Sequence, residues 1–391
     1  MKCNWTTKRL SEIAYINPRE SLGKGVVAKK VPMDKLQPFC RDIPEFVLEE
    51  YKCGTKFRNG DTIMARITPC LENGKIAKVS VLSDGEVGFG STEYIVFRAI
   101  DGVSDADFLY YLICSPLVRN PAIKSMVGSS GRQRVQTDVV ANLDIELPPI
   151  EEQRKIGGLL KAIDDKIELN NAINNNLEQQ AQAVYYKMFS EVNTVPVELS
   201  SIIDVRDGTH DSPKAQATGY YLITSKHLLP FGLDKASANH ISKADFDKIN
   251  ERSLVETQDI LMSMIGTIGL ISYIPYETVD FAIKNVALFK TSHTPELAYY
   301  FLCYLKSEKT LQHIGKCLAG STQKYISLGE LRKMPIYSPT TNEIREFNCL
   351  VKPMLEKIIS RTHENALLAE MRDSLLPKLM SGELDVSDIE L

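Results

Sequence analysis

The chain has 391 residues, a net charge of −4 at pH 7 and 43% hydrophobic residues, which together favour a folded protein with more than one domain. Its charge changes from +3 over residues 1–145 (20 basic, 17 acidic) to −4 over residues 336–391 (6 basic, 10 acidic), which excludes binding to polyanions through bulk charge. The sequence lacks both an apolar run near the roughly 18 residues that span a bilayer and a signal peptide, so we expect a cytoplasmic protein with no membrane partner.

Residues 1–145 predict a globular α+β domain. A glycine-rich turn, SDGEVGFGS (83–91), precedes a β-type run, EYIVFRA (93–99). The helical pattern DADFLYYLICSPLV (105–118) follows.

Residues 146–190 predict one long helix that begins near Glu151, after the Pro148-Pro149 pair. Gly157 and Gly158 each cost about 1 kcal/mol in a helix interior. The seam positions nevertheless follow steps of four and three, the period of a coiled coil. The seam residues that we predict here are Ile156, Leu160, Ile163, Ile167, Asn174, Leu177, Val184 and Met188.

Residues 191–335 predict a second α+β domain. The β-type run DILMSMI (259–265) is followed by the helical pattern PELAYYFLCYLKSE (295–308).

Residues 336–391 predict a second long helix. Pro353 and Pro377 remove backbone donors, so we expect this helix to break near Pro353 and to end before Pro377 or bend there. Its seam lies 191 residues after the first seam and comprises Phe347, Val351, Ile358, Asn365, Leu368 and Leu375.

The two halves resemble each other at an offset of about 190 to 198 residues, which predicts an ancient duplication. NGDTIMARI (59–67) matches TQDILMSMI (257–265), and DADFLYYLIC (105–114) matches TPELAYYFLC (294–303). Because both seams also share a register, we prefer an antiparallel intramolecular coiled coil to two separate amphipathic helices. A pseudo-two-fold repeat of this kind would place one globular domain at each end of the helices.

Catalytic and metal-binding motifs are missing from the sequence. Neither a phosphate-binding GxxxxGK[ST] loop nor a dinucleotide-binding glycine fingerprint is present, and the histidines lack metal-ligand spacing, so we predict no catalytic, metal or cofactor site. Asp61 with ENGK (72–75) weakly resembles a nuclease cluster, but we interpret it as a solvated turn. The eight cysteines contain no CxxC pair, and we interpret them as reduced, mostly buried thiols.

LPPIEEQRKIGGLLKAIDDKIE (147–168) resembles the central conserved region of specificity (S) subunits of type I restriction-modification systems. DGTHDSPK (207–214), GSTQKYISLGELRKMPI (320–336) and LLPKLMSGEL (375–384) extend the resemblance over essentially the whole chain. The second helical region departs from the pattern, because SPTTNEIREF (338–347) replaces the PPIEEQ wording.

The resemblance implies two target recognition domains, residues 1–145 and 191–335, each reading one half of a bipartite double-stranded DNA sequence. The helical regions, 146–190 and 336–391, would dock methyltransferase (M) subunits, two of them, and set the spacing. A helix over 156–188 would be about 50 Å long, or about 15 base pairs. S-adenosylmethionine, ATP and Mg²⁺ are expected on the M and restriction (R) subunits, and no cofactor on this chain, which would not itself be an enzyme.

Candidate DNA contacts are polar residues in loops, because arginine pairs well with guanine and glutamine with adenine in the major groove. One group of candidates lies just before each globular domain joins its helix. The remaining candidates lie in turns that can reach bases or phosphates. These residues are Arg132, Gln133, Arg134, Ser321, Thr322, Gln323 and Lys324, and then Arg66, Thr68, Thr209, His210 and Lys214.

Two alternatives remain open at this stage. A coiled-coil adaptor without DNA specificity would join two proteins. A fused restriction-methylation enzyme would need nuclease or methyltransferase motifs that the sequence does not contain.

Overall fold

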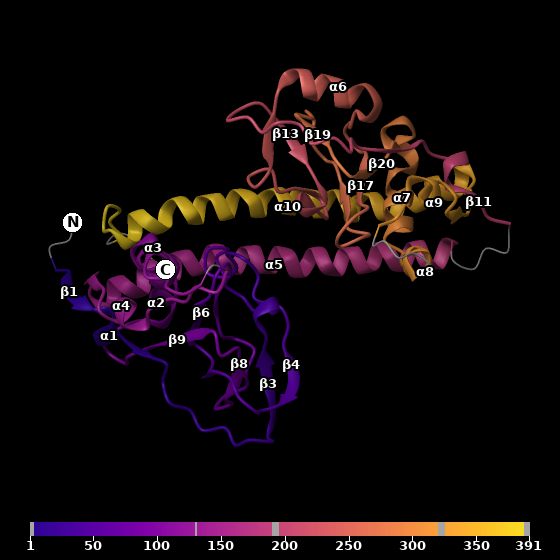
Figure 1. Ribbon diagram of the computed structural model, residues 1–391. Coiled ribbons are helices and arrows are strands. Elements are labelled where there is room, and N and C mark those ends of the chain that lie inside the picture. Colours follow the sequence, from indigo (N-terminus) through magenta and orange to yellow (C-terminus); the bar gives the residue numbers. More distant parts are fainter. Residues whose placement is uncertain (1–3, 130, 190–194, 320–324, 387–391) are drawn as a thin grey trace. The chain divides into compact units, whose positions relative to one another are not determined.

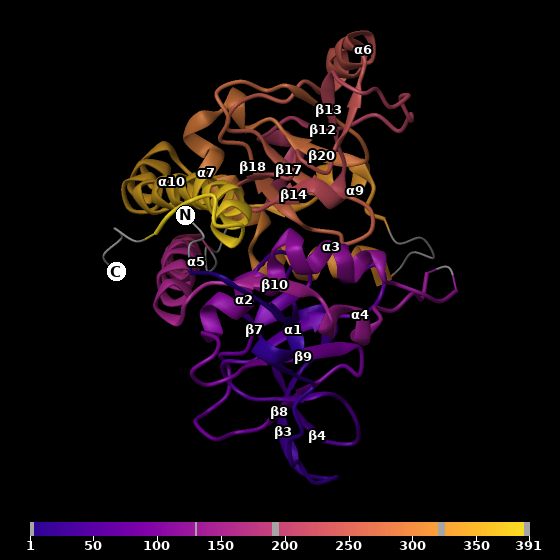
Figure 2. The same ribbon diagram turned by 90° about the vertical axis from the view of Figure 1, so that its left-hand side faces the viewer.

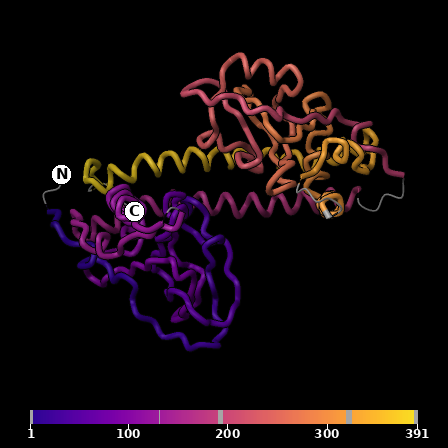
Figure 3. Tube along the Cα trace, viewed as in Figure 1, coloured from indigo at the N-terminus to yellow at the C-terminus, as the bar shows by residue number. Residues whose placement is uncertain are grey.

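The computed structural model describes residues 4–129, 131–189, 195–319 and 325–386. The chain divides into two compact units, one formed by residues 1–169 with 365–391 and the other by residues 170–364. Helices α5 (Ile150–Phe189) and α10 (Thr341–Met380) each contribute one part to the first unit and one part to the second. Figure 3 shows the ends of the colour ramp meeting in the first unit, where the indigo N-terminal segment lies beside the yellow end of α10.

The first unit contains two four-stranded sheets, with strand orders β2-β9-β6-β7 and β4-β3-β8-β5. All pairs in the first sheet are antiparallel, whereas β3 and β8 in the second are parallel. Helix α2 packs against β6, β7 and β9, and it carries six consecutive buried residues from Phe108 to Ile113. The elements before α5 are β1 (Thr6–Arg9), α1 (Leu10–Ile13), β2 (Ala14–Ile16), β3 (Val27–Val31), η1 (Met33–Lys35), β4 (Val47–Glu50), β5 (Lys56–Phe57), β6 (Thr62–Ala65), β7 (Ile76–Lys78), β8 (Gly88–Gly90), β9 (Tyr94–Ala99), α2 (Ala106–Cys114), α3 (Pro116–Lys124), α4 (Thr137–Ala141) and β10 (Asp144–Leu147).

The second unit repeats this plan with its own strands (Figure 1). Its main sheet has the order β12-β20-β17-β18, and a second sheet, β16-β13-β19, again contains one parallel pair. The predicted α+β class and internal repeat are thus confirmed by matching strand orders. The elements between α5 and α10 are β11 (Val197–Glu198), η2 (Leu199–Ser201), β12 (Val205–Asp207), β13 (Tyr220–Ile223), η3 (Ser225–His227), β14 (Leu228–Leu229), β15 (Gly232–Leu233), β16 (Asn239–Ile241), α6 (Lys243–Ser253), β17 (Ile260–Ser263), β18 (Ile271–Tyr273), β19 (Phe281–Ile283), β20 (Val286–Phe289), η4 (Thr291–His293), η5 (Pro295–Leu297), α7 (Ala298–Leu305), α8 (Glu308–Ala319), α9 (Leu328–Arg332) and β21 (Pro335–Ile336).

The parts of α5 and α10 within each unit lie side by side (Figures 1 and 2). In the second unit, Asn170 donates a hydrogen bond to Glu364 at 2.8 Å, while the Phe189 ring lies 5.4 Å from the Phe347 ring. As the residue number increases along α5, the number of the contacting residue in α10 therefore decreases. This confirms the predicted antiparallel packing.

Every predicted seam residue is buried or half-buried. The aromatic part of the seam was not predicted: Tyr185 and Phe189 join Phe347 and Tyr300 of α7 in one cluster. These two aromatic residues stand one position after the predicted Val184 and Met188, so the helix turns a wider apolar face toward α7 than a strict seam requires.

The expected break in the second helix is wrong. Helix α10 runs without interruption through Pro353 and Pro377 to Met380. A proline in a helix interior costs about 3 kcal/mol, but burying a large apolar side chain contributes about 1.5–3 kcal/mol each. Four such residues on the same face of α10 offset the cost, namely Phe347, Val351, Leu355 and Ile358.

The packing at the start of α5 explains why one of its two glycines is needed there. A Cβ atom on Gly157 would lie 2.6 Å from the backbone nitrogen of Phe108, at the N-terminus of α2. One turn earlier, the buried Gln153 accepts from the Asp105 backbone N–H and donates to the carbonyls of Val103 and Pro148. Gly157 therefore permits a close helix-to-helix approach that Gln153 holds in place.

Candidate nucleic-acid interface

In the first unit, the candidate residues gather where a loop crosses the end of strand β6. The Val135 N–H donates to the Arg66 carbonyl at 2.8 Å, and the Thr68 N–H donates to the Gln133 carbonyl at 3.0 Å. Residues 66–68 and 133–135 thus form one platform, held by an antiparallel bridge between Ile67 and Arg134. The sequence placed these two groups about 65 residues apart, and the fold brings them together.

Arg66 and Thr68 are half-buried supports of this platform. Arg66 donates to the Val135 carbonyl at 3.0 Å, and Thr68 donates to the Glu72 carboxylate at 3.0 Å. Their polar groups therefore stabilise the loop. Arg132 is exposed and Gln133 is half-buried, so these two remain open to a ligand.

Arg134 forms an ion pair with Glu93, the residue just before strand β9. Its Nε and Nη2 atoms donate to the Glu93 carboxylate at 2.9 and 2.6 Å, with 47% of the Arg134 side chain exposed. Hydrogen bonding from Arg134 lowers the pKa of Glu93 below its usual value. Glu93 carried no signal in the sequence, because its partner comes from strand register rather than from spacing.

In the second unit, His210 is held through both ring nitrogens. Nδ1 lies 2.8 Å from Asn285 Oδ1, and Nε2 lies 3.1 Å from Asp207 Oδ2. Arg252 of α6 donates to the other Asp207 oxygen at 2.8 Å. This network joins α6 to the loop that follows β12. Asp207, Arg252 and Asn285 were not predicted from the sequence.

The remaining candidates of the second unit separate into two groups. Thr209 is half-buried and bonded through its backbone to residues 283 and 285, whereas Lys214 is exposed further along the loop. Ser321, Thr322, Gln323 and Lys324 lie outside the described residues. The next residue, Tyr325, is 45% exposed and lines a cavity together with His210.

The interpretation of Asp61 as a solvated turn is wrong. Asp61 is 1% exposed and accepts two hydrogen bonds of 2.7 Å from Arg98. In the second unit, the buried Asp259 pairs in the same way with Lys290 at 2.6 Å. Both buried aspartates therefore form ion pairs that tie the start of a central strand to the end of its neighbour.

Three further results concern cysteines, metals and membrane spans. The seven cysteines in the described part of the chain are free thiols, but only Cys303 among them is buried, so the expectation of mostly buried thiols is wrong. Within the described ranges, no group of three or more His, Cys, Asp or Glu side chains could hold a metal ion. No described helix is both long and apolar enough to cross a membrane.

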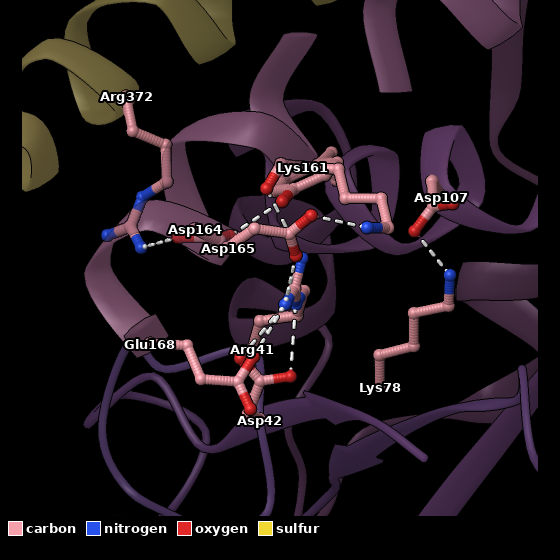
Figure 4. A network of polar contacts seen from close by, with 10 residues as sticks. Arg41, Asp42, Lys78, Asp107, Lys161, Asp164, Asp165, Glu168 and Arg372 are labelled. Carbon is pink, nitrogen blue, oxygen red and sulfur yellow. Dashed lines mark hydrogen bonds and ion pairs between the residues drawn. The ribbon is translucent and has the colours of Figure 1, made fainter. Parts of the chain in front are cut away.

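A charged network joins the first unit's globular part to its helices (Figure 4). Arg41, 7% exposed, pairs with Asp165 at 2.7 Å and Glu168 at 3.2 Å on α5. Asp164, the residue before Asp165, pairs with Arg372 of α10. Acidic side chains of α5 therefore pair with arginines of the globular part and of α10, beside the apolar contacts that Ile156 and Leu160 make with the same core.

The two units share one strand order in their main sheets, and each contains parts of the two antiparallel helices. A known family matches this chain. A family model described as the type I restriction modification DNA specificity domain matches residues 3–179 and 192–359. The chain belongs to the type I restriction-modification specificity family. The predicted resemblance is therefore confirmed, and with it the prediction of a non-catalytic specificity subunit.

Relatives in this specificity family resemble the chain over most of its length. The type I restriction enzyme MjaIX specificity subunit of Methanocaldococcus jannaschii is 26% identical over 320 residues, covering 74% of this chain and 71% of that one. The HindI specificity subunit of Haemophilus influenzae is 24% identical over 403 residues, covering 84% and 87%. The type I S subunit from M. genitalium has the same fold, with a TM-score of 0.56, 16% identity and 96% coverage of both chains.

Proposed function

We propose that this specificity subunit reads a bipartite sequence in double-stranded DNA, one half with each unit. The observation that carries the proposal is the repeated plan of the two units, which places different side chains on the same platform. In the first unit, Arg134 and Glu93 lie at the platform at the end of β6. In the second unit, the bridge between Ile265 and Tyr325 at the end of β17 forms the equivalent platform, where Tyr325 and Asn285 lie. A two-part DNA target requires two recognition domains that share a fold but carry different side chains at the DNA-contacting surface.

The helices would serve the rest of the complex. Each has 40 residues, which corresponds to about 60 Å. We propose that they set the spacing between the half-sites and dock two M subunits, with R subunits completing the endonuclease in the cytoplasm. S-adenosylmethionine, ATP and Mg²⁺ would then bind to those partners. The family membership does not favour an adaptor without DNA specificity.

Adenine-methylation mapping by long-read sequencing tests this function. Cells that carry the chain with its M partner should show a bipartite motif with a fixed gap, and cells that lack only this chain should lose it. Unchanged methylation, with an M subunit shown to be expressed and active, would contradict the proposal. The same motif would also give both half-sites and their gap.

A further inference from the structure

The hydrogen-bond registers of the two units define equivalent positions. Ala65 pairs with Tyr94 in the first unit, and Ser263 pairs with Val286 in the second. The residues just before Tyr94 and Val286, Glu93 and Asn285, therefore occupy the same place beside the central strand.

The crossing loops are equivalent by the same criterion. The bridge between Ile67 and Arg134 corresponds to the bridge between Ile265 and Tyr325. The next backbone bonds also match, because Val135 donates to the Arg66 carbonyl and Ile326 donates to the Met264 carbonyl. One pair of positions thus holds Glu93 and Arg134 in the first unit, and Asn285 and Tyr325 in the second.

In the first unit, this pair fixes the orientation of an arginine. Glu93 contacts the guanidinium of Arg134 from the side, through Nε and Nη2. A guanidinium carries five N–H groups, so this contact leaves the Nη1 edge and one Nη2 hydrogen for a second ligand. That outer edge is the one that can donate to O6 and N7 of guanine together.

In the second unit, the same pair lines a cavity. A space of about 180 Å³ lies between His210, Asn285, Ile265 and Tyr325. Asn285 has a positive φ of 53°, and its backbone N–H donates to the Thr209 carbonyl, so both backbone and side chain are held. Its Oδ1 faces His210 at 2.8 Å, and no described residue bonds its Nδ2.

We propose, resting on the DNA-reading function above, that Arg134 and Asn285 are the specificity-determining residues of the two half-sites. Arg134 reads a guanine, with Glu93 as its positioning residue. Asn285 reads an adenine, since a carboxamide can donate to N7 through Nδ2 and accept from N6 through the second lone pair of Oδ1. His210 positions Asn285, and the exposed Ile265 and Tyr325 form the apolar wall beside the base.

Methylation mapping of single variants tests this assignment, with the chain expressed beside its M partner. Arg134→Gln should remove the requirement for one guanine in one half-site, raising methylation of sites altered there about tenfold or more relative to the cognate site. Asn285→Ala should do the same for one adenine in the other half-site. Glu93→Gln should relax the guanine position less than Arg134→Gln does.

The design contains its own folding control. In each variant the half-site read by the other unit should stay unchanged, which a misfolded or unassembled chain could not achieve. Matched surface variants away from the platforms, Lys30→Gln in β3 and Lys243→Gln in α6, should leave both halves unchanged.

The outcomes separate the two levels of the proposal. A wild-type chain that directs no bipartite motif overturns the proposed function itself. A wild-type motif that persists unaltered in both variants, or a change of both variants in the same half-site, overturns only the assignment of Arg134 and Asn285.

Discussion

Asp164 of α5 accepts a hydrogen bond from Arg372 of α10, with 2.7 Å between Oδ1 and Nη1, and their side chains are only 5% and 12% exposed. Tyr111 of α2 donates to the other Asp164 oxygen at 2.6 Å. Burial lowers the pKa of the Arg372 guanidinium, but Asp164 and Asp373 together outweigh burial and raise this pKa above its usual value. One carboxylate therefore ties together α2, α5 and α10 in the first unit.

Removing one member of this pair should destabilise the first unit strongly. Arg372→Met leaves a buried carboxylate without its cation, which we expect to cost about 3 kcal/mol of unfolding free energy in urea titrations. Asp164→Leu with Arg372→Met should recover much of that loss, because the charged partner left unpaired, Asp373, is 61% exposed. Lys352→Ala, which breaks an exposed pair with Glu356, should cost less than about 0.5 kcal/mol.

Two glycine-to-alanine changes in helices should have opposite signs. At Gly315 in α8 a Cβ meets nothing within 4 Å, so Gly315→Ala should stabilise by about 0.5–1 kcal/mol. At Gly157 the Cβ meets backbone at 2.6 Å, so Gly157→Ala should destabilise although alanine favours helix. Thermal unfolding of the two variants decides the matter, and equal shifts would contradict the close approach of α5 to α2.

The start of α10 should respond to acid. Thr340 and Glu343 exchange backbone-to-side-chain hydrogen bonds of 2.7 and 3.3 Å, a capping box. The Thr340 N–H lowers the pKa of Glu343, so the stability that its charge adds is complete above the usual glutamate value of about 4.5. That stability is lost as pH falls through the lowered value.

Glu343→Gln measures this contribution. We expect it to cost about 0.5 kcal/mol at pH 7, a difference from the wild type that shrinks as the solution is acidified below pH 4.5. Thr340→Ala should cost about 1 kcal/mol. A Glu343→Gln difference that grew on acidification would show that the carboxylate is not stabilised in the folded state.

Arg132 should contribute to affinity but little to specificity. It is exposed, and no described side chain bonds its guanidinium, so it can reach a phosphate without a fixed orientation. Arg132→Ala should reduce the slope of log K against log salt by about 1 and leave the methylated motif intact. Titrations of labelled DNA with the S–M complex at several salt concentrations measure the slope, and a changed motif would assign Arg132 to base reading.

Much of the fold could be predicted because its signals are local and repeated. The seam from Ile156 to Met188 recurs 191 residues later, and a period needs no knowledge of tertiary structure. The proline prediction was wrong for the opposite reason: Pro353 was judged by local cost, while the burial of Val351 and Leu355 beside it depends on a partner helix far away in sequence.

The candidate site could be predicted only in part. Arg66 and Arg134 could be named as candidates because arginine in a polar loop is informative by itself. Glu93 and Asn285 carried no signal in the sequence because each meets its partner only in the fold. Glu93 contacts Arg134, 41 positions away, and Asn285 contacts His210, 75 positions away. Asp61 was misjudged because its sequence neighbours are turn residues, whereas its partner Arg98 lies on another strand.

The first unit draws Leu379, Met380 and Val386 into its core, each 2% exposed or less, whereas the second unit is one continuous segment. During translation, the ribosome releases residues 1–169 long before this last segment exists. The core of the first unit therefore cannot be completed until the end of the chain has been synthesised, whereas the second unit can fold before that. A protease cut shortly after residue 364 would accordingly destabilise the first unit, which contains the N-terminal domain, and leave the second unit folded.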